Sequence, residues 1–154
     1  MDVAIDQPTV KEVLSRMDDG WAAFIQSVRA LPAERIEQRL SEDGWTRKQM
    51  LAHIGVWHDL TIDRLAQQAE TGKPVESEED EDAVNARAAR GAVGRTTGEV
   101  ILAMEESYRR LRREVARLTN EQVAANDSWA AAIIAANTYG HYGEHMPDLD
   151  RRSA

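Results

Sequence analysis

The sequence predicts an all-α fold: one four-helix bundle domain covering residues 1–154, with a long crossover between the second and third helices. Three observations predict it. Apolar residues recur every three or four positions along four long segments, and the strict alternation typical of strands is absent from the sequence. The stretch from 71 to 95 interrupts the helical pattern in the middle of the chain and is long enough to be a crossover.

Composition and charge restrict the possible functions. The chain has no cysteine, so disulfides, thiolate nucleophiles and iron–sulfur clusters are excluded, and His, Asp or Glu must hold any metal. The formal net charge of −8 argues against duplex nucleic acid as a partner, because neutralising phosphates requires a basic face. No apolar run approaches the roughly 18 residues of a membrane span, and a signal-peptide pattern is absent. We therefore expect a soluble, cytoplasmic protein with no membrane partner.

The first long helix is expected to follow a short lead, residues 1–8. Thr9 is placed to cap it, with Glu12 at the third helical position. Leu31 precedes a proline, which disfavours the helical conformation and ends the helix. Residues 33–44 then form a polar connection with room for a short helical turn. One amphipathic face is made by Val10, Val13, Leu14, Met17, Trp21, Phe24, Ile25, Val28 and Leu31.

The second long helix is expected to begin at Trp45 or Thr46 and to run to about Ala69. Its apolar residues cover more than a narrow stripe, which predicts burial over a wide arc. They are Met50, Leu51, Ile54, Trp57, Leu60, Ile62 and Leu65. His53 lies in the row of Trp57 and points to the interior or its edge. His58 lies about 140° from His53 around the helix, so we expect a partly exposed side chain outside any site that contains His53.

The connection from 71 to 95 contains two breaks. Thr71-Gly72-Lys73-Pro74 stops the second helix, and Gly91 and Gly94 bracket the second break. Between them, residues 76–82 form an acidic run, which we interpret as a solvated loop and first helical turn; an acidic cation site is the alternative. Residues 83–90 are expected to form a short helix.

The third long helix is expected to be capped by Thr96 or Thr97, with Glu99 in its first turn. Its apolar face comprises Val100, Ile101, Met104, Tyr108, Leu111, Val115 and Leu118. Its C-terminal half is rich in arginine, as the helix dipole favours: Arg109, Arg110, Arg112, Arg113 and Arg117. A nucleic-acid-binding arm is the alternative, but interleaved glutamates at 105, 106 and 114 argue against it.

The fourth long helix is expected to begin near Asp127 or Ser128 and to end at Pro147. It carries two of the four histidines of the chain, His141 and His145. Their i, i+4 spacing places both imidazoles on one face, one turn apart, an arrangement that suits a single metal ion. The same face, followed backwards, is a buried stripe that ends in polar residues: His145, His141, Thr138, Ile134 and Ala130.

Connection lengths predict the topology. Short connections join the first helix to the second and the third to the fourth, so each of these pairs should be antiparallel. Residues 71–95, at up to about 3.3 Å per residue, can cross the whole bundle. The third helix would then run parallel to the second, in an up-down-down-up order. This order brings His53, in the first third of its helix, close to His141 and His145 in the last turns of theirs.

Two motifs carry a resemblance to a known family. They are Gly44-Trp45-Thr46 with Leu51-Ala52-His53-Ile54 and Trp57, and Asn137-Thr138-Tyr139 followed by His141 and His145. The chain resembles the DinB-like superfamily, which includes proteins of the mycothiol-dependent maleylpyruvate isomerase type. The resemblance implies a bundle with a long crossover and a divalent metal held by His53, His141 and His145. Several members resemble metal-dependent transferases that use a low-molecular-weight thiol, and others resemble small-molecule resistance proteins.

Three neutral imidazoles would leave a divalent ion with its full charge and an open position for water or substrate. The metal could be zinc, nickel or iron. We expect either a metal-dependent transferase or hydrolase of a small electrophile, with the thiol of any sulfur chemistry coming from a cosubstrate, or a protein that sequesters a small molecule without turnover. Three separate histidines without metal, or an interaction bundle without a pocket, are the other interpretations. No catalytic acid or base can be assigned.

Further side chains are candidates for the surroundings of the site. Asn137 lies one turn before His141 and could bind a ligand or simply be satisfied at the end of the bundle. Glu144 could orient a histidine or be a surface residue. Trp57 is a candidate for the pocket or for the core.

A homodimer is expected from the wide apolar arc of the second helix. The four tryptophans of the chain, at 21, 45, 57 and 129, point the same way, because they are many large rings for one small core. A two-fold pair is the commonest arrangement for oligomers of this kind. In the alternative, residues 71–95 fold back and cover the arc within one chain.

Overall fold

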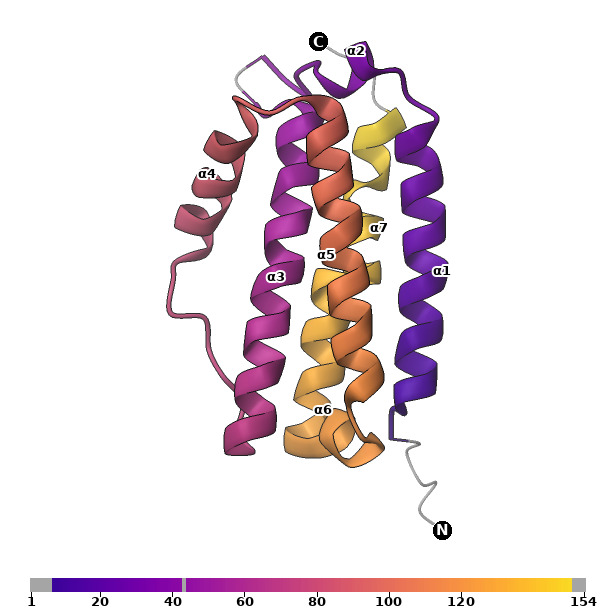
Figure 1. Cartoon of the computed structure of the whole chain (residues 1–154), viewed down its shortest axis with the longest axis vertical. Helices are drawn as coiled ribbons and strands as arrows, with labels where there is room; N and C mark the ends of the chain where they lie inside the picture. Colours follow the sequence, from indigo (N-terminus) through magenta and orange to yellow (C-terminus); the bar gives the residue numbers. More distant parts are fainter. Residues whose placement is uncertain (1–6, 43, 151–154) are drawn as a thin grey trace.

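The computed structural model describes residues 7–42 and 44–150, and these residues form seven helices and no strand (Figure 1). The helices are α1 (Val10–Arg29), α2 (Ala33–Ile36), α3 (Arg47–Thr71), α4 (Glu81–Ala92), α5 (Thr97–Arg117), α6 (Asn120–Asn137) and α7 (Tyr139–Asp150). The all-α prediction is confirmed. Residues 1–6 of the expected lead lie outside the described residues. In the described part of the chain, every helix is too short or too polar to cross a lipid bilayer.

Threonine caps begin the long helices where the sequence predicts them. Thr9, Thr46 and Thr96 each accept a hydrogen bond from the backbone N–H three residues later. At Thr46 and Thr96 the side chain at the third helical position bonds back to the cap, which completes a capping box. These caps satisfy N–H groups that would otherwise have no partner, and so fix where α1, α3 and α5 begin.

Contacts between helices give their relative directions. Lys48, at the start of α3, donates to the carbonyl of Arg95, just before α5, at 2.8 Å. Nearer the C-terminal ends of both helices, Arg110 of α5 donates to Asp59 of α3 at 2.8 Å. Because both contacts join corresponding parts of the two helices, α3 and α5 run parallel. The amide of Val10 donates to the Asn120 side chain at 2.9 Å, which places the starts of α1 and α6 together. Figure 1 shows the segment after α3 returning along the outside of that helix before α5 begins.

Helix α4 covers part of the apolar arc of α3. Trp57 of α3 donates from Nε1 to Asn85 Oδ1 at 2.8 Å, and Gln49 donates to the carbonyl of Ala89 at 3.3 Å. On the inner side of α4, Val84 and Ala92 are fully buried. The crossover therefore folds back and covers part of the apolar arc within one chain, as the alternative to a dimer requires. The homodimer itself stays a prediction.

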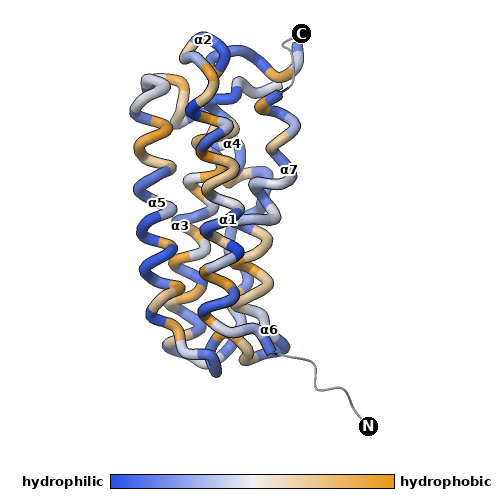
Figure 2. The backbone as a smooth tube through the Cα atoms, turned by 90° about the vertical axis from the view of Figure 1, so that its right-hand side faces the viewer, coloured by the Kyte–Doolittle hydropathy of each residue, from blue (hydrophilic) through white to orange (hydrophobic). Residues whose placement is uncertain are grey.

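The core runs the length of the bundle between α1, α3, α5 and the α6–α7 pair. Figure 2 shows hydrophobic segments recurring along each long helix between hydrophilic ones. Aromatic rings fill the middle: Trp21 stacks on Tyr108 with ring centroids 4.4 Å apart, and Phe24 stacks on Tyr142 at 5.1 Å. The other large apolar side chains that are fully buried are Met17, Ile36, Met50, Leu51, Ile54, Leu65, Met104, Leu111 and Ile134.

The predicted start of the fourth long helix coincides with a break inside α6. Thr119 caps α6, eight to nine residues before the expected Asp127 or Ser128. Asn126, Asp127 and Ser128 have φ between 55° and 62°, so they form a left-handed turn that divides α6 into two helical segments. The segment that carries Trp129 begins directly after this turn, as predicted, but neither Asp127 nor Ser128 has the extended conformation of a cap. The polar Asn–Asp–Ser sequence, which indicated a helix start, instead occupies the conformation that such short polar side chains tolerate best.

The predicted continuous helix up to Pro147 is wrong. The backbone breaks at Thr138, whose φ and ψ are −124° and −107°, and whose Oγ1 donates to the carbonyl of Ile134 at 2.6 Å. This side chain takes the place of a main-chain donor, which ends α6. Helix α7 then continues through Pro147 to Asp150, because the proline removes only one hydrogen bond and the buried Leu149 holds the following turn against the core.

We expect opposite effects from two glycine-to-alanine substitutions in helices. A Cβ at Gly20 would lie 2.7 Å from Tyr139 Cβ, whereas a Cβ at Gly91 would meet nothing within 4 Å. Gly91→Ala should stabilise the protein by up to about 1 kcal/mol, as alanine normally does in a helix. Gly20→Ala should destabilise it by about 1–3 kcal/mol, because α1 and α7 must separate. Urea unfolding of both variants measures this, and a stabilised Gly20→Ala would contradict the α1–α7 packing.

Candidate metal centre

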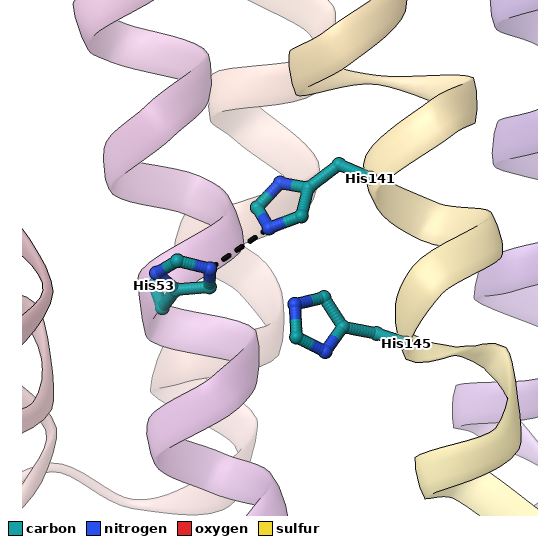
Figure 3. A group of neighbouring side chains, drawn as sticks. All are labelled: His53, His141 and His145. Atoms are coloured by element: carbon teal, nitrogen blue, oxygen red, sulfur yellow. Dashed lines mark hydrogen bonds between the residues drawn. The ribbon is translucent and has the colours of Figure 1, made fainter. Parts of the chain in front are cut away.

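Three histidines from two helices converge at one point (Figure 3). His53 comes from α3, and His141 and His145 come from successive turns of α7. One nitrogen of each ring lies within 4.8 Å of the others, and the Nε2 atoms of His53 and His141 are 2.8 Å apart. The structure therefore brings together the three residues that the family resemblance implies as ligands.

Burial keeps two of these imidazoles neutral. Burial, together with a smaller contribution from the charge of a protonated His145, lowers the pKa of His53 to about 4, although the nearby Asn85 amide offsets part of the shift. It lowers the pKa of His141 to about 3, with smaller contributions from His53 and His145. Neutral imidazole is the form that binds a metal, so the two side chains carry lone pairs ready for coordination at neutral pH.

Asp148 orients the third histidine. Nδ1 of His145 lies 3.0 Å from Oδ2 of Asp148, which leaves the other ring nitrogen facing His53 and His141. A carboxylate behind a ligating histidine is the usual way to fix its tautomer and ring orientation. The sequence reasoning assigned such a role to Glu144 and overlooked Asp148. The i, i+3 spacing from His145 was the available signal, but the helix was expected to end at Pro147.

The cluster fits a divalent ion. A tetrahedral ion with N–metal bonds of about 2.1 Å holds its nitrogens about 3.4 Å apart. The separations among the three histidines, from 2.8 Å up to 4.8 Å, lie on both sides of that value. In addition, Nδ1 of His53 and Nδ1 of His141 are buried and have no hydrogen-bond partner in the described structure, so each of these rings is satisfied at one nitrogen only.

A cavity of about 600 Å³ opens beside the cluster and includes all three histidines in its wall. Trp57, Asn137 and Glu144, the three surrounding residues that the sequence singled out, all line it. The remaining lining residues are Trp45, Arg64, Ser77, Glu79, Glu81, Asn85 and Ala136. The volume is that of a typical small-molecule site, and part of its wall comes from the crossover. Aromatic side chains therefore do not fill the space beside the histidines.

His58 is a buried core residue, and the expected partial exposure is wrong. Its Nδ1 lies 2.8 Å from Ser107 Oγ, and its Nε2 lies 2.6 Å from Tyr142 Oη. Because Ser107 donates to the carbonyl of Met104, it accepts from His58 Nδ1–H, and Tyr142 donates to Nε2. His58 lies outside the group that contains His53, as predicted, but α5 and α7 enclose its side of α3. Burial lowers the pKa of His58 to about 3.

The acidic run of residues 76–82 and the arginine-rich half of α5 both take part in ion pairs. Glu79 of the acidic run pairs with Arg87, and within residues 7–42 and 44–150 only the three histidines form a group able to hold a metal. Three of the five C-terminal arginines of α5 have acidic partners: Arg110 with Asp59, Arg112 with Asp18 and Arg117 with Glu114. These ion pairs reduce the positive charge available for a nucleic-acid backbone.

The fold and the histidine cluster define an α-helical bundle with a candidate metal centre between α3 and α7. The chain belongs to the DinB superfamily, whose family model matches residues 9–146. No curated protein matches the sequence.

Solved structures share the fold at low identity. Colibactin self-resistance protein ClbS, crystallised in complex with a double-stranded DNA, is 13% identical with a TM-score of 0.77, over 96% of each chain. A protein from Streptococcus pneumoniae is 13% identical with a TM-score of 0.74, over 94% of this chain and 90% of that one. An uncharacterised protein from Escherichia coli UTI89 is 14% identical with a TM-score of 0.75, over 97% and 94%. These likenesses support the fold.

We expect the metal-free protein to lose stability in mild acid. In the unfolded chain each histidine takes up a proton near pH 6.5, whereas folded His53, His58 and His141 stay neutral until about pH 3 to 4. The unfolded state thus binds more protons, and stability falls as the pH drops below 6.5, by about 1.4 kcal/mol per pH unit for each such histidine. In His58→Gln the slope of unfolding free energy between pH 6 and 5 should be smaller by that amount. An unchanged slope in urea titrations would contradict the buried neutral state of His58.

Proposed function

We propose that this protein is a metal-dependent transferase or hydrolase that acts on a small electrophile, with His53, His141 and His145 as the ligands of a divalent ion. The observation that carries the proposal is the convergence of three imidazoles, two of them held neutral by burial, in the wall of a cavity of about 600 Å³. The proposal includes an up-down-down-up helix order, which the parallel pairing of α3 with α5 supports.

The residues present would give the metal a defined setting. His145 is held by Asp148, so one of its nitrogens faces the cluster before any metal binds. A bound zinc, nickel or iron ion would act as a Lewis acid that polarises a carbonyl or lowers the pKa of a water or thiol. Trp45 and Trp57 offer apolar ring surface to the body of a substrate. The Asn137 amide N–H is bonded to the carbonyl of Ile133, which leaves its own oxygen to accept a hydrogen bond from a ligand.

A low-molecular-weight thiol is the proposed cosubstrate. The chain has no cysteine, so it supplies no thiolate of its own. The cavity is large enough for a small electrophile beside part of a thiol compound. A cytoplasmic location suits this chemistry, because low-molecular-weight thiols stay reduced there.

The second candidate is a protein that sequesters a small molecule without turnover. It is favoured by the likeness in fold to the self-resistance protein ClbS. We propose no nucleic-acid partner for this chain. The net charge of −8 and the paired arginines of α5 support a small-molecule ligand instead.

We expect one divalent ion per chain in the purified protein. His53→Ala and the double variant His141→Ala with His145→Ala should lose it, because a single remaining imidazole or pair cannot hold the ion. His58→Gln should keep the full metal content, since His58 faces α5 and α7 rather than the cluster. Elemental analysis of the four proteins decides this. Full metal content in the double variant would rule out the proposed ligand set.

Turnover separates the two candidate functions. We expect the metal-loaded protein to consume many equivalents of at least one electrophile from a panel in the presence of a low-molecular-weight thiol, and to stop after treatment with a chelator. Product formation is followed by mass spectrometry with and without thiol. Loss of only one equivalent of electrophile per chain, with no released product, would support sequestration and contradict the enzyme.

A further inference from the structure

We propose that Arg47 is a positioning residue for the metal centre. It holds the last turn of α7, and through Asp148 in that turn it sets the orientation of His145. The functional consequence of this inference rests on the proposed metal site, whereas the chain of contacts behind it does not. Arg47 is separated from Asp148 by 101 positions in the sequence, and neither residue lines the cavity.

The burial of Arg47 calls for an explanation. Its side chain is 0% exposed and is the largest of the fully buried side chains among the described residues. A guanidinium group is costly to remove from water unless its N–H groups find partners. Two of them do so on main-chain carbonyls: Nε donates to Asp148 at 2.9 Å, and the Nη1 group donates to Arg35 at 2.9 Å. The cation therefore ties the start of α3 to the end of α7 and to α2.

The last turn of α7 needs an external donor. The final carbonyls of any helix have no partner within that helix, and they carry the negative end of its dipole. Helix α7 has no basic residue of its own in the last turn. Pro147 lacks an N–H as well, so the carbonyl of Gly143 loses its intrahelical partner. Arg47 supplies from another helix a donor to a carbonyl of this weakened turn, that of Asp148, together with the favourable charge.

The weakened turn is the one that orients His145. His145 and Asp148 lie on either side of Pro147, and their side chains meet at 3.0 Å. When Asp148 accepts from Nδ1–H, the Nε2 atom of His145 is left without a proton and available to a metal. If the turn moved, the ring could rotate or take the other tautomer. Arg47, bound to the main chain of Asp148 itself, limits this movement.

A double-mutant cycle tests the proposal. The variants are Arg47→Met, Asp148→Ala and both together, with Val115→Ala as a matched control, because Val115 is fully buried on α5 and contributes to the core without lining the cavity. Zinc affinity is measured by chelator competition. In the metal-free proteins, long-range ¹H–¹⁵N NMR reports the tautomer of His145, and thermal unfolding reports stability.

We expect Arg47→Met and Asp148→Ala each to weaken zinc binding about 10- to 100-fold, the usual cost of losing a group that orients a ligand. The double variant should be no weaker than Asp148→Ala, because Arg47 acts through Asp148. In Arg47→Met the His145 signal should change from the Nδ1–H form to a mixture. Val115→Ala should lower the unfolding temperature without changing zinc affinity or tautomer.

Two results would overturn the proposal. The first is an Arg47→Met variant that folds with wild-type zinc affinity and the wild-type tautomer of His145. The second is an additive loss of zinc affinity in the double variant, which is expected if Arg47 only stabilises the fold. If Arg47→Met does not fold, Arg47→Lys takes its place in the same cycle, since an ammonium group keeps the charge but cannot reproduce both bonds. If the wild type binds none of zinc, nickel and iron, the proposed function fails, while the tautomer of His145 still decides the role of Arg47.

Discussion

The return of the chain along the outside of α3 is the constraint on which the other features of the molecule depend. Because the crossover carries the chain back to the starting end of α3, α5 begins beside Lys48 and runs parallel to α3. The next segment must then come back in the opposite direction. His141 and His145 therefore reach the level of His53, which lies in the first third of α3. The same return places α4 against Trp57, so the crossover also closes one side of the cavity.

Buried polar groups fix α7 in this arrangement. His58, itself bonded to Ser107, accepts a hydrogen bond from the Tyr142 hydroxyl, and Arg47 donates to the carbonyl of Asp148. Each of these groups is costly to bury and is compensated only when α7 sits in one position. Apolar packing alone tolerates small shifts of a helix, whereas a bonded polar group does not. The backbone that carries His141 and His145 is therefore held in one position.

The parts that could be predicted from the sequence are those that local chemistry determines. Threonine caps and apolar periodicity gave the starts of α1, α3 and α5, and the i, i+4 spacing gave the shared face of His141 and His145. The set of three ligands came from the family resemblance. The errors depend on neighbours distant in sequence: the burial of His58 results from α5 and α7, and the passage of α7 through Pro147 results from contacts with the core. Asp148 was overlooked for the same reason.

The cavity wall has two parts with different tolerance to mutation. The three histidines belong to the inner part, and they stand on helices that the fully buried Arg47 and Tyr142, outside the wall itself, hold in place. Ser77, Glu79 and Glu81, which form much of the outer part, belong to the crossover and are exposed. Substitutions there cost little stability, since surface positions contribute little to folding. Evolution could therefore vary the ligand range of this scaffold by altering one solvated segment, while the histidine centre and its supports stay the same.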